Sequence, residues 1–104
     1  MIRKAFKMKL YPNQMVEYIN RHNPIWNDLI ITLKNHGVHN YNIFFDNEDN
    51  TLFAYVEVES EIQWQAISKT EICQKWWTYM KDIMETNSDN SPISKNLISV
   101  FYLK

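Results

Sequence analysis

The spacing of hydrophobic residues changes along this chain in an order that restricts the fold more than any other feature of the sequence. Apolar residues alternate with charged ones over Ile2–Leu10, follow a helical spacing over Met15–Leu33, and then form two further strand-like segments, Val38–Phe45 and Thr51–Glu59. A period of two is typical of strands and a period near 3.6 is typical of helices. The polar segment Asp46–Asn50 between the last two predicts a hairpin turn.

A proline interrupts the first helical segment. On a helical wheel its apolar residues share one stripe, made of Met15, Ile19, Trp26, Leu29 and Leu33. Pro24 has no N–H to donate to residue 20, so we expect the helix to bend or break there. Gly37, the only glycine in the chain, stands where a helix C-cap belongs.

Two capping residues predict helices in the second half of the chain. Ser60, followed by Gln63, fits a capping box that opens a short helix through Ile67. Thr70 is suited to cap a second helix, from Glu71 to about Met84. A polar loop over Thr86–Ser94 then leads to a predicted final strand, Leu97–Leu103.

The predicted order is therefore strand, helix, strand, strand, helix, strand. This is the split βαβ plan of the α+β class, an antiparallel sheet with helices on one face. The strand Thr51–Glu59 carries apolar or aromatic residues on both faces, since Phe53 and Tyr55 alternate with aliphatic side chains. A second copy of the chain is the simplest cover for the face without helices, so we expect a homodimer.

Composition excludes several classes of protein. The 104 residues fit one domain, which we expect to span residues 1–104, and the net charge of −1 gives no electrostatic reason for binding nucleic acid or an anionic membrane. The single cysteine, Cys73, excludes an internal disulfide. No apolar run of signal-peptide or membrane length is present at the start, so we expect a cytoplasmic protein. HExxH, CxxC and glycine-rich phosphate motifs are all absent, so we expect no metal.

His22 is the most informative candidate for chemistry. On an ideal helix it lies within the apolar stripe, between Ile19 and Trp26, and Tyr18 lies one turn earlier on the same side. One interpretation is a core histidine bound to a backbone carbonyl. The other is a general acid–base residue, because a histidine that titrates near neutral pH stands beside a phenol and an indole.

Three further aromatic residues fit either packing or ligand binding. The last helix has a stripe of Ile72, Trp76, Met80 and Ile83, which makes Trp76 a core residue and turns Trp77 sideways toward a neighbouring element or a cavity. An indole stacks well on the C–H face of a sugar. On the second strand, alternation places His39 and Tyr41 on one face, where Tyr41 could donate a hydrogen bond into a pocket or only pack.

Seven segments in order resemble the L-rhamnose mutarotase family along nearly the whole chain. They are MIRKAF, EYINRHNPIW, LKNHGVHNY, VEVESEIQW, CQKWWTYMKDIM, DNSPIS and VFYL. The resemblance implies a homodimer of ferredoxin-like subunits, a dimeric α+β barrel, that interconverts the α and β anomers of L-rhamnose. Mutarotation opens and recloses a hemiacetal by proton transfer, so we expect no cofactor.

The resemblance also implies roles for individual residues. His22 in RHNPIW takes the proton-donor role, and the sugar-contacting roles fall to Tyr18, Tyr41, Trp76 and Trp77. The chain departs from the family pattern at the turn Asn47–Thr51, at Glu61–Gln63 and at Lys104, which leaves the exact sugar preference open.

The sequence leaves other questions open. The second proton-transfer group could be a tyrosine, the carboxylate of Glu17 or water. Two other functions fit the same fold plan. One is a small dimeric ferredoxin-like monooxygenase with an aromatic cavity, and the other is a sugar-binding domain without catalytic activity.

Overall fold

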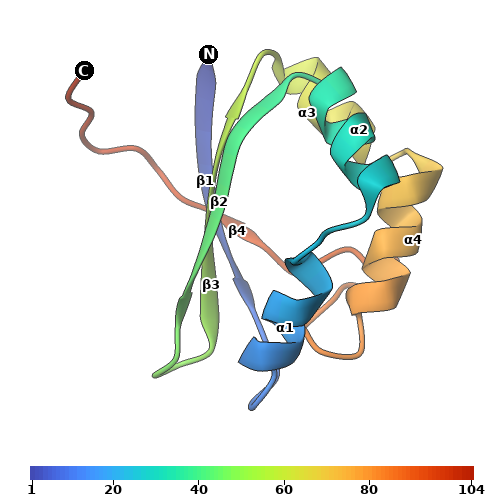
Figure 1. Cartoon of the computed structure of the whole chain (residues 1–104). Coiled ribbons are helices and arrows are strands. Elements are labelled where there is room, and N and C mark those ends of the chain that lie inside the picture. Colours follow the sequence, from blue (N-terminus) through green and yellow to red (C-terminus); the bar gives the residue numbers. More distant parts are fainter.

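The protein, described over residues 1–104 by a computed structural model, is built on one antiparallel sheet with its helices on one face (Figure 1). The strand order is β2-β3-β1-β4. The strands are β1 (Ile2–Lys9), β2 (Val38–Asp46), β3 (Thr51–Val58) and β4 (Lys95–Asn96). The helices are α1 (Met15–His22), α2 (Asn27–Asn35), α3 (Glu61–Ile67) and α4 (Glu71–Met80). The predicted α+β class, split βαβ plan and central hairpin are confirmed.

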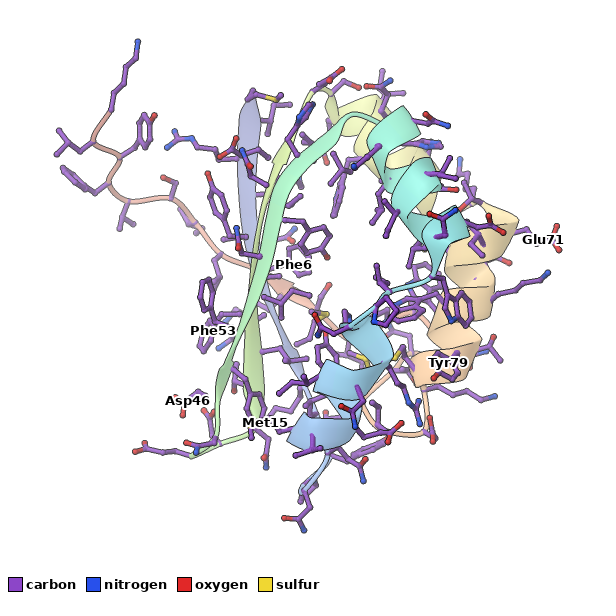
Figure 2. The ribbon with its side chains drawn as sticks, in the orientation of Figure 1. Phe6, Met15, Asp46, Phe53, Glu71 and Tyr79 are labelled. Carbon is purple, nitrogen blue, oxygen red and sulfur yellow. The ribbon has the colours of Figure 1, made fainter.

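The core lies between this sheet and the helices. β1 and β3 pair without a break from Ile2 opposite Val58 to Lys9 opposite Thr51, so their inward side chains line up across the pair. Phe6 and Met8 from β1 pack there with four residues of β3: Leu52, Ala54, Val56 and Val58. Figure 2 shows Phe6 pointing toward the helices and Phe53 pointing away from them, as the alternation predicts.

A bulge in β2 changes which residues of this strand share a face. The register between β2 and β3 shifts between His39 and Asn42, and Asn40 has a positive φ of 46°. The extra residue reverses the alternation, so Tyr41 turns inward against Phe6, with ring centroids 6.5 Å apart. His39 remains on the opposite face, exposed and paired with Glu59. The prediction that His39 and Tyr41 share a face is therefore wrong.

Pro24 ends the first helix, as the sequence predicts. α1 stops at His22 and α2 starts at Asn27, so the two helices have independent orientations. The apolar stripe is interrupted for this reason: Met15 and Ile19 are 40% and 49% exposed, and Tyr18 is the buried residue of α1. Gly37 follows α2 with a φ of 76°, which confirms the glycine C-cap.

Both predicted N-caps are present. The Ser60 hydroxyl accepts a hydrogen bond from the N–H of Gln63 at 3.0 Å, and the Thr70 hydroxyl accepts one from Cys73 at 3.3 Å. α4 ends four residues earlier than predicted. The chain after Met80 instead bonds to the end of β1, where Tyr11 N donates to the Ile83 carbonyl at 2.9 Å.

The predicted last strand, Leu97–Leu103, is wrong. β4 contains only Lys95 and Asn96, and the last main-chain bond to β1 is from Leu97 N to the Ala5 carbonyl at 2.8 Å. Residues 97–104 then run away from the sheet on the side opposite the helices (Figure 1). A strand requires a neighbour for its main-chain hydrogen bonds, and beyond Leu97 this C-terminal tail makes none within the chain.

Candidate active site

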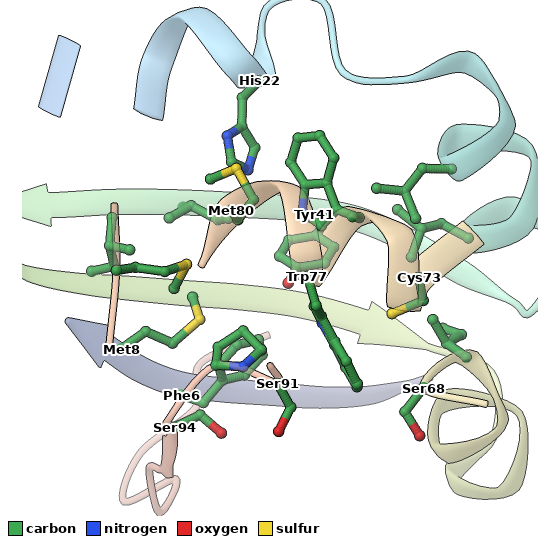
Figure 3. Close-up of a pocket in the computed structure, with 18 of the residues that line it drawn as sticks. Phe6, Met8, His22, Tyr41, Ser68, Cys73, Trp77, Met80, Ser91 and Ser94 are labelled. Carbon is green, nitrogen blue, oxygen red and sulfur yellow. The ribbon is translucent and has the colours of Figure 1, made fainter. Parts of the chain in front are cut away.

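A large cavity lies between the inner face of the sheet and the helices, lined in part by residues of the core. Its volume is about 1470 Å³, and most of the residues that line it are hydrophobic. All five candidate residues of the sequence analysis line this one cavity: Tyr18, His22, Tyr41, Trp76 and Trp77. In Figure 3, His22, Tyr41 and Trp77 reach the same space from a helix, a strand and a second helix. Large, mostly apolar cavities with a few polar groups are the usual form of small-molecule sites.

The hydrogen bonding of His22 distinguishes its two ring nitrogens. His22 is the last residue of α1, and its Nδ1 lies 2.9 Å from the carbonyl oxygen of Tyr18. A carbonyl oxygen only accepts, so Nδ1 carries the hydrogen. In the neutral ring Nε2 then has a free lone pair, and it has no partner within the chain. His22 is bound to a backbone carbonyl and lines the cavity at the same time.

Aromatic rings hold the imidazole on two sides. The Tyr18 ring stacks on it with centroids 4.1 Å apart, and the Trp76 ring meets it edge-on at 5.1 Å. Burial lowers the pKa of His22 below its ordinary value of 6.5, and the hydrogen bond to the Tyr18 carbonyl offsets only part of this effect. The neutral form, with Nε2 able to accept a proton, therefore predominates at neutral pH.

Tyr18 and Tyr41 contribute hydrogen-bond donors, whereas the neutral His22 offers an acceptor at Nε2. Burial is the main cause that raises the pKa of Tyr18 and of Tyr41 well above the ordinary value of 10.0, so both hydroxyls stay protonated. Neither hydroxyl is hydrogen-bonded within the chain. Every side-chain nitrogen or oxygen atom that is fully enclosed in this protein has a hydrogen-bond partner. The Tyr18 hydroxyl has no partner, so it is not fully enclosed although Tyr18 is a buried residue, and it is reachable from the cavity. Both phenols can therefore donate to a ligand.

The two tryptophans of α4 form part of the cavity wall. Trp76 is only partly buried and contacts Trp26 at 5.1 Å as well as His22, so it is not the plain core residue that the helical stripe predicts. Cys73 and Met80 are the buried residues of α4. Trp77 reaches into the cavity beside Tyr41, as expected from its position about 100° around the helix (Figure 3).

Several cavity residues are absent from the sequence-based site. Ser91 and Ser94 come from the loop before β4 and lie near Phe6 in Figure 3. The polar composition of this loop gives no sign that part of it lines a cavity. Cys73 also lines the cavity, and burial raises the pKa of its thiol to about 11, which keeps it in the unreactive protonated form.

One candidate for the second proton-transfer group lies elsewhere. The Glu17 carboxylate accepts a hydrogen bond from Arg21 Nε at 2.7 Å and does not line the cavity. No three His, Cys, Asp or Glu side chains are grouped closely enough to hold a metal ion. The helices are all too short or too polar to cross a membrane.

Comparison with known proteins decides the family. A family model described as L-rhamnose mutarotase matches residues 3–103. The chain belongs to the L-rhamnose mutarotase family. An L-rhamnose mutarotase from Tolumonas auensis is 60% identical over 103 residues, which cover 99% of each chain. The crystal structure of an L-rhamnose mutarotase from Formosa agariphila superposes with a TM-score of 0.92 at 45% identity, with all of both chains covered.

More distant structures share the fold of this mutarotase family alone. A dimeric ferredoxin-like protein from an uncultured marine organism gives a TM-score of 0.67 at 16% identity and covers 98% of this chain and 96% of its own. A protein from Nitrosomonas europaea described as a putative antibiotic biosynthesis monooxygenase gives a TM-score of 0.64 at 10% identity and covers 97% of this chain and all of its own. The ferredoxin-like fold is thereby confirmed, and nothing favours the monooxygenase or the non-catalytic function.

Proposed function

We propose that this protein is an isomerase that interconverts the α and β anomers of L-rhamnose. Family membership over nearly the whole chain supports the activity and the substrate. The observation that carries the mechanism is the state of His22: its Nδ1–H is bound to the Tyr18 carbonyl, its Nε2 has no partner within the chain, and its side chain lines a cavity that two protonated phenols also line. A base and an acid therefore face one small-molecule space.

We infer a mechanism in which His22 first accepts a proton and later returns it. Nε2 takes the proton of the anomeric hydroxyl while the bond between C1 and the ring oxygen breaks and C1=O forms. The ring oxygen receives a proton from a phenol, Tyr18 or Tyr41. After rotation about C1–C2 the ring oxygen attacks the other face of C1, His22 returns its proton to the carbonyl oxygen, and the phenolate recovers its own.

The remaining candidate residues bind the sugar in this proposal. The hydroxyl of the phenol that does not transfer a proton can hold a sugar hydroxyl. Trp76 and Trp77 stack on the C–H face and the C6 methyl group and exclude water. Acid–base catalysis of this kind contributes about a hundred- to ten-thousand-fold in rate. The mechanism uses no metal or organic cofactor.

We also propose that residues 1–104 act as one domain and that two copies form a homodimer. Support for the dimer comes from exposed apolar groups on the sheet face without helices and on the C-terminal tail. A net charge of −1 supports neither nucleic acid nor an anionic membrane as a partner. The cytoplasmic location stays a prediction.

The direct test is saturation transfer between the two anomeric proton signals of L-rhamnose. Adding catalytic amounts of protein is expected to increase the exchange rate well above the spontaneous rate. His39→Ala is the matched control, since it removes an exposed histidine outside the cavity and is expected to retain full activity. Tight sugar binding without faster exchange would instead identify a binding protein and contradict the proposal.

A further inference from the structure

Arg21, the residue before His22, joins α1 to the end of α4. Its Nη1 donates to the Tyr79 carbonyl at 2.6 Å and to Asp82 Oδ1 at 2.8 Å, and Nη2 donates to Asp82 Oδ2 at 3.1 Å. Nε donates to Glu17 on the same helix at 2.7 Å. The arginine side chain is only 11% exposed. A two-point fork of this kind fixes orientation as well as distance.

The same guanidinium also closes a ring of aromatic contacts that includes the imidazole. It lies over the Tyr79 ring, 4.6 Å from the centroid. Tyr79 stacks on Trp26 at 5.2 Å, Trp26 meets Trp76 at 5.1 Å, and Trp76 meets His22 at 5.1 Å. His22 is thus linked to Arg21 by the backbone on one side and by four aromatic contacts on the other.

The contacts of Arg21 hold the last turn of α1, where the helix backbone gives His22 the least support. α1 has eight residues, and a helix this short is marginal unless tertiary contacts hold it. His22 is its last residue, and Pro24 follows two residues later. The hydrogen bond that orients the imidazole comes from the Tyr18 carbonyl within this last turn. Any fraying of the turn would therefore release both the ring and its tautomer.

We propose that Arg21 is a positioning residue for catalysis, one that holds the last turn of α1 against α4 so that the His22 imidazole keeps its place at the cavity wall. This inference rests on the proposed mutarotase function. Arg21 is not among the residues that line the cavity, so its effect on the reaction runs through His22 and Trp76. Small displacements of a reacting group are costly, up to about 100-fold for a shift of 1 Å.

The test compares Arg21→Ala in two backgrounds, with kcat and KM measured by polarimetry on a freshly dissolved single anomer. In the wild-type background we expect kcat to fall about 10- to 100-fold while KM changes much less, because the tyrosines and Trp77 remain in place. In a His22→Ala background the same change should lower the residual exchange less than about twofold, because groups that act as one unit are not additive.

Two further variants keep the outcome interpretable. Arg21→Lys is expected to recover part of kcat, since an ammonium group reaches Asp82 but cannot form the fork. If Arg21→Ala does not fold, the same measurements are made on Asp82→Asn, which changes the partner of Arg21 instead. Lys75→Ala on α4 is the control, because it removes an exposed pair with Glu71 and should leave kcat unchanged.

The outcomes of these measurements distinguish failure of the positioning role of Arg21 from failure of the proposed mutarotase function. An Arg21→Ala variant that loses thermal stability but keeps its kcat, measured well below its melting temperature, would overturn the positioning role alone. Equal loss in both backgrounds would also overturn it, because Arg21 would then act independently of His22. Wild-type protein that does not accelerate anomer exchange would overturn both proposals.

Discussion

At the scale of single residues, the Tyr18 carbonyl determines what His22 can do in a first proton transfer. Because Nδ1 donates to this oxygen, the neutral ring offers only a lone pair, at Nε2, to anything in the cavity. The family resemblance implies a proton donor at this position. The structure supports a base that becomes a donor after it has accepted a proton, and the first acid must then be a phenol or water.

Replacement of His22 by alanine tests this role. We expect His22→Ala to stay folded and to lose about two to four orders of magnitude in the rate of anomer exchange, the usual contribution of a positioned acid or base. Sugar binding should be largely retained, because Tyr18, Tyr41, Trp76 and Trp77 still line the cavity. Saturation transfer measures the exchange, and titration of the protein fluorescence with L-rhamnose measures the binding.

A tryptophan variant gives the opposite pattern and serves as the comparison. Trp77→Ala is expected to weaken binding more than turnover, since stacking acts on the ground state and the transition state alike. Near-normal exchange in folded His22→Ala would show that the histidine is only a packing residue.

The pH dependence of the reaction follows from the burial of His22. Burial places the pKa of the folded-state imidazole below 6.5. Exchange should therefore be level above pH 6.5 and fall as the pH decreases through the lowered pKa, because protonation removes the free lone pair of Nε2. Enzyme-catalysed exchange, corrected for the spontaneous rate at each pH, measures this profile. A rate that rises on acidification would contradict the role as a base.

The stability of the fold, like the exchange rate, should decrease as the pH falls. The unfolded chain binds a proton at His22 near its ordinary pKa of 6.5, whereas the folded chain binds it only at lower pH. The contribution of the neutral, buried ring to stability is therefore complete above pH 6.5 and is lost as the pH falls through the folded-state pKa. Urea unfolding of wild type and His22→Ala across this range separates the histidine from other groups.

At the scale of secondary-structure elements, local chemistry predicts more than long-range pairing does. The hairpin, both N-caps, the break at Pro24 and the glycine after α2 all follow from short sequence signals and are all present. The bulge at Asn40 and the early end of α4 depend on contacts with other elements. α4 stops because the chain after Met80 bonds to the end of β1, which no helical pattern reveals.

Gly37 allows a prediction for one of these elements. Its φ of 76° is a conformation that side chains rarely adopt, and an added Cβ would lie 2.9 Å from the Cβ of Glu59. We expect Gly37→Ala to destabilise the fold by about 1–3 kcal/mol. Each kcal/mol should lower the melting temperature by about 4–8 °C for a domain near 100 residues. Thermal unfolding at a fixed protein concentration measures it.

The control for this prediction is a neighbouring residue of ordinary conformation. Asn35→Ala changes an exposed position at the end of α2 and should shift stability by no more than about 0.5 kcal/mol. Equal melting temperatures for wild type and Gly37→Ala would show that the left-handed turn is not required.

At the scale of the whole molecule, the grouping of the five candidate residues around one cavity could be predicted only in part. Helical spacing places Tyr18 beside His22, but nothing in the spacing brings Tyr41 or the tryptophans to them. Their grouping was implied by family resemblance, and the structure now gives the physical reason. The bulge turns Tyr41 inward, and α4 packs Trp76 against His22 at the end of α1 and places Trp77 in the cavity wall.

The outer face of the sheet and the C-terminal tail leave apolar groups uncovered in the single chain. Phe44 and Phe53 on the outer face are 67% and 39% exposed. In the tail, Ile98, Val100 and Phe101 are at least 78% exposed. The tail stays on this side of the sheet, since Arg3 of β1 lies 3.3 Å from the centroid of the Tyr102 ring. Both sets of apolar groups therefore lie on the side of the sheet without helices, where a second copy can cover them.

The expected oligomeric state is therefore a homodimer of twice 12.6 kDa at micromolar concentration, measured by sedimentation equilibrium. Phe53→Lys should shift the protein toward monomer, because a charge on the outer face would lose its water in the interface. Val16→Lys is the matched control, since Val16 is equally apolar and 64% exposed but lies on α1, on the helical side of the sheet. A wild-type monomer, or equal dissociation of both variants, would contradict an interface at the outer face.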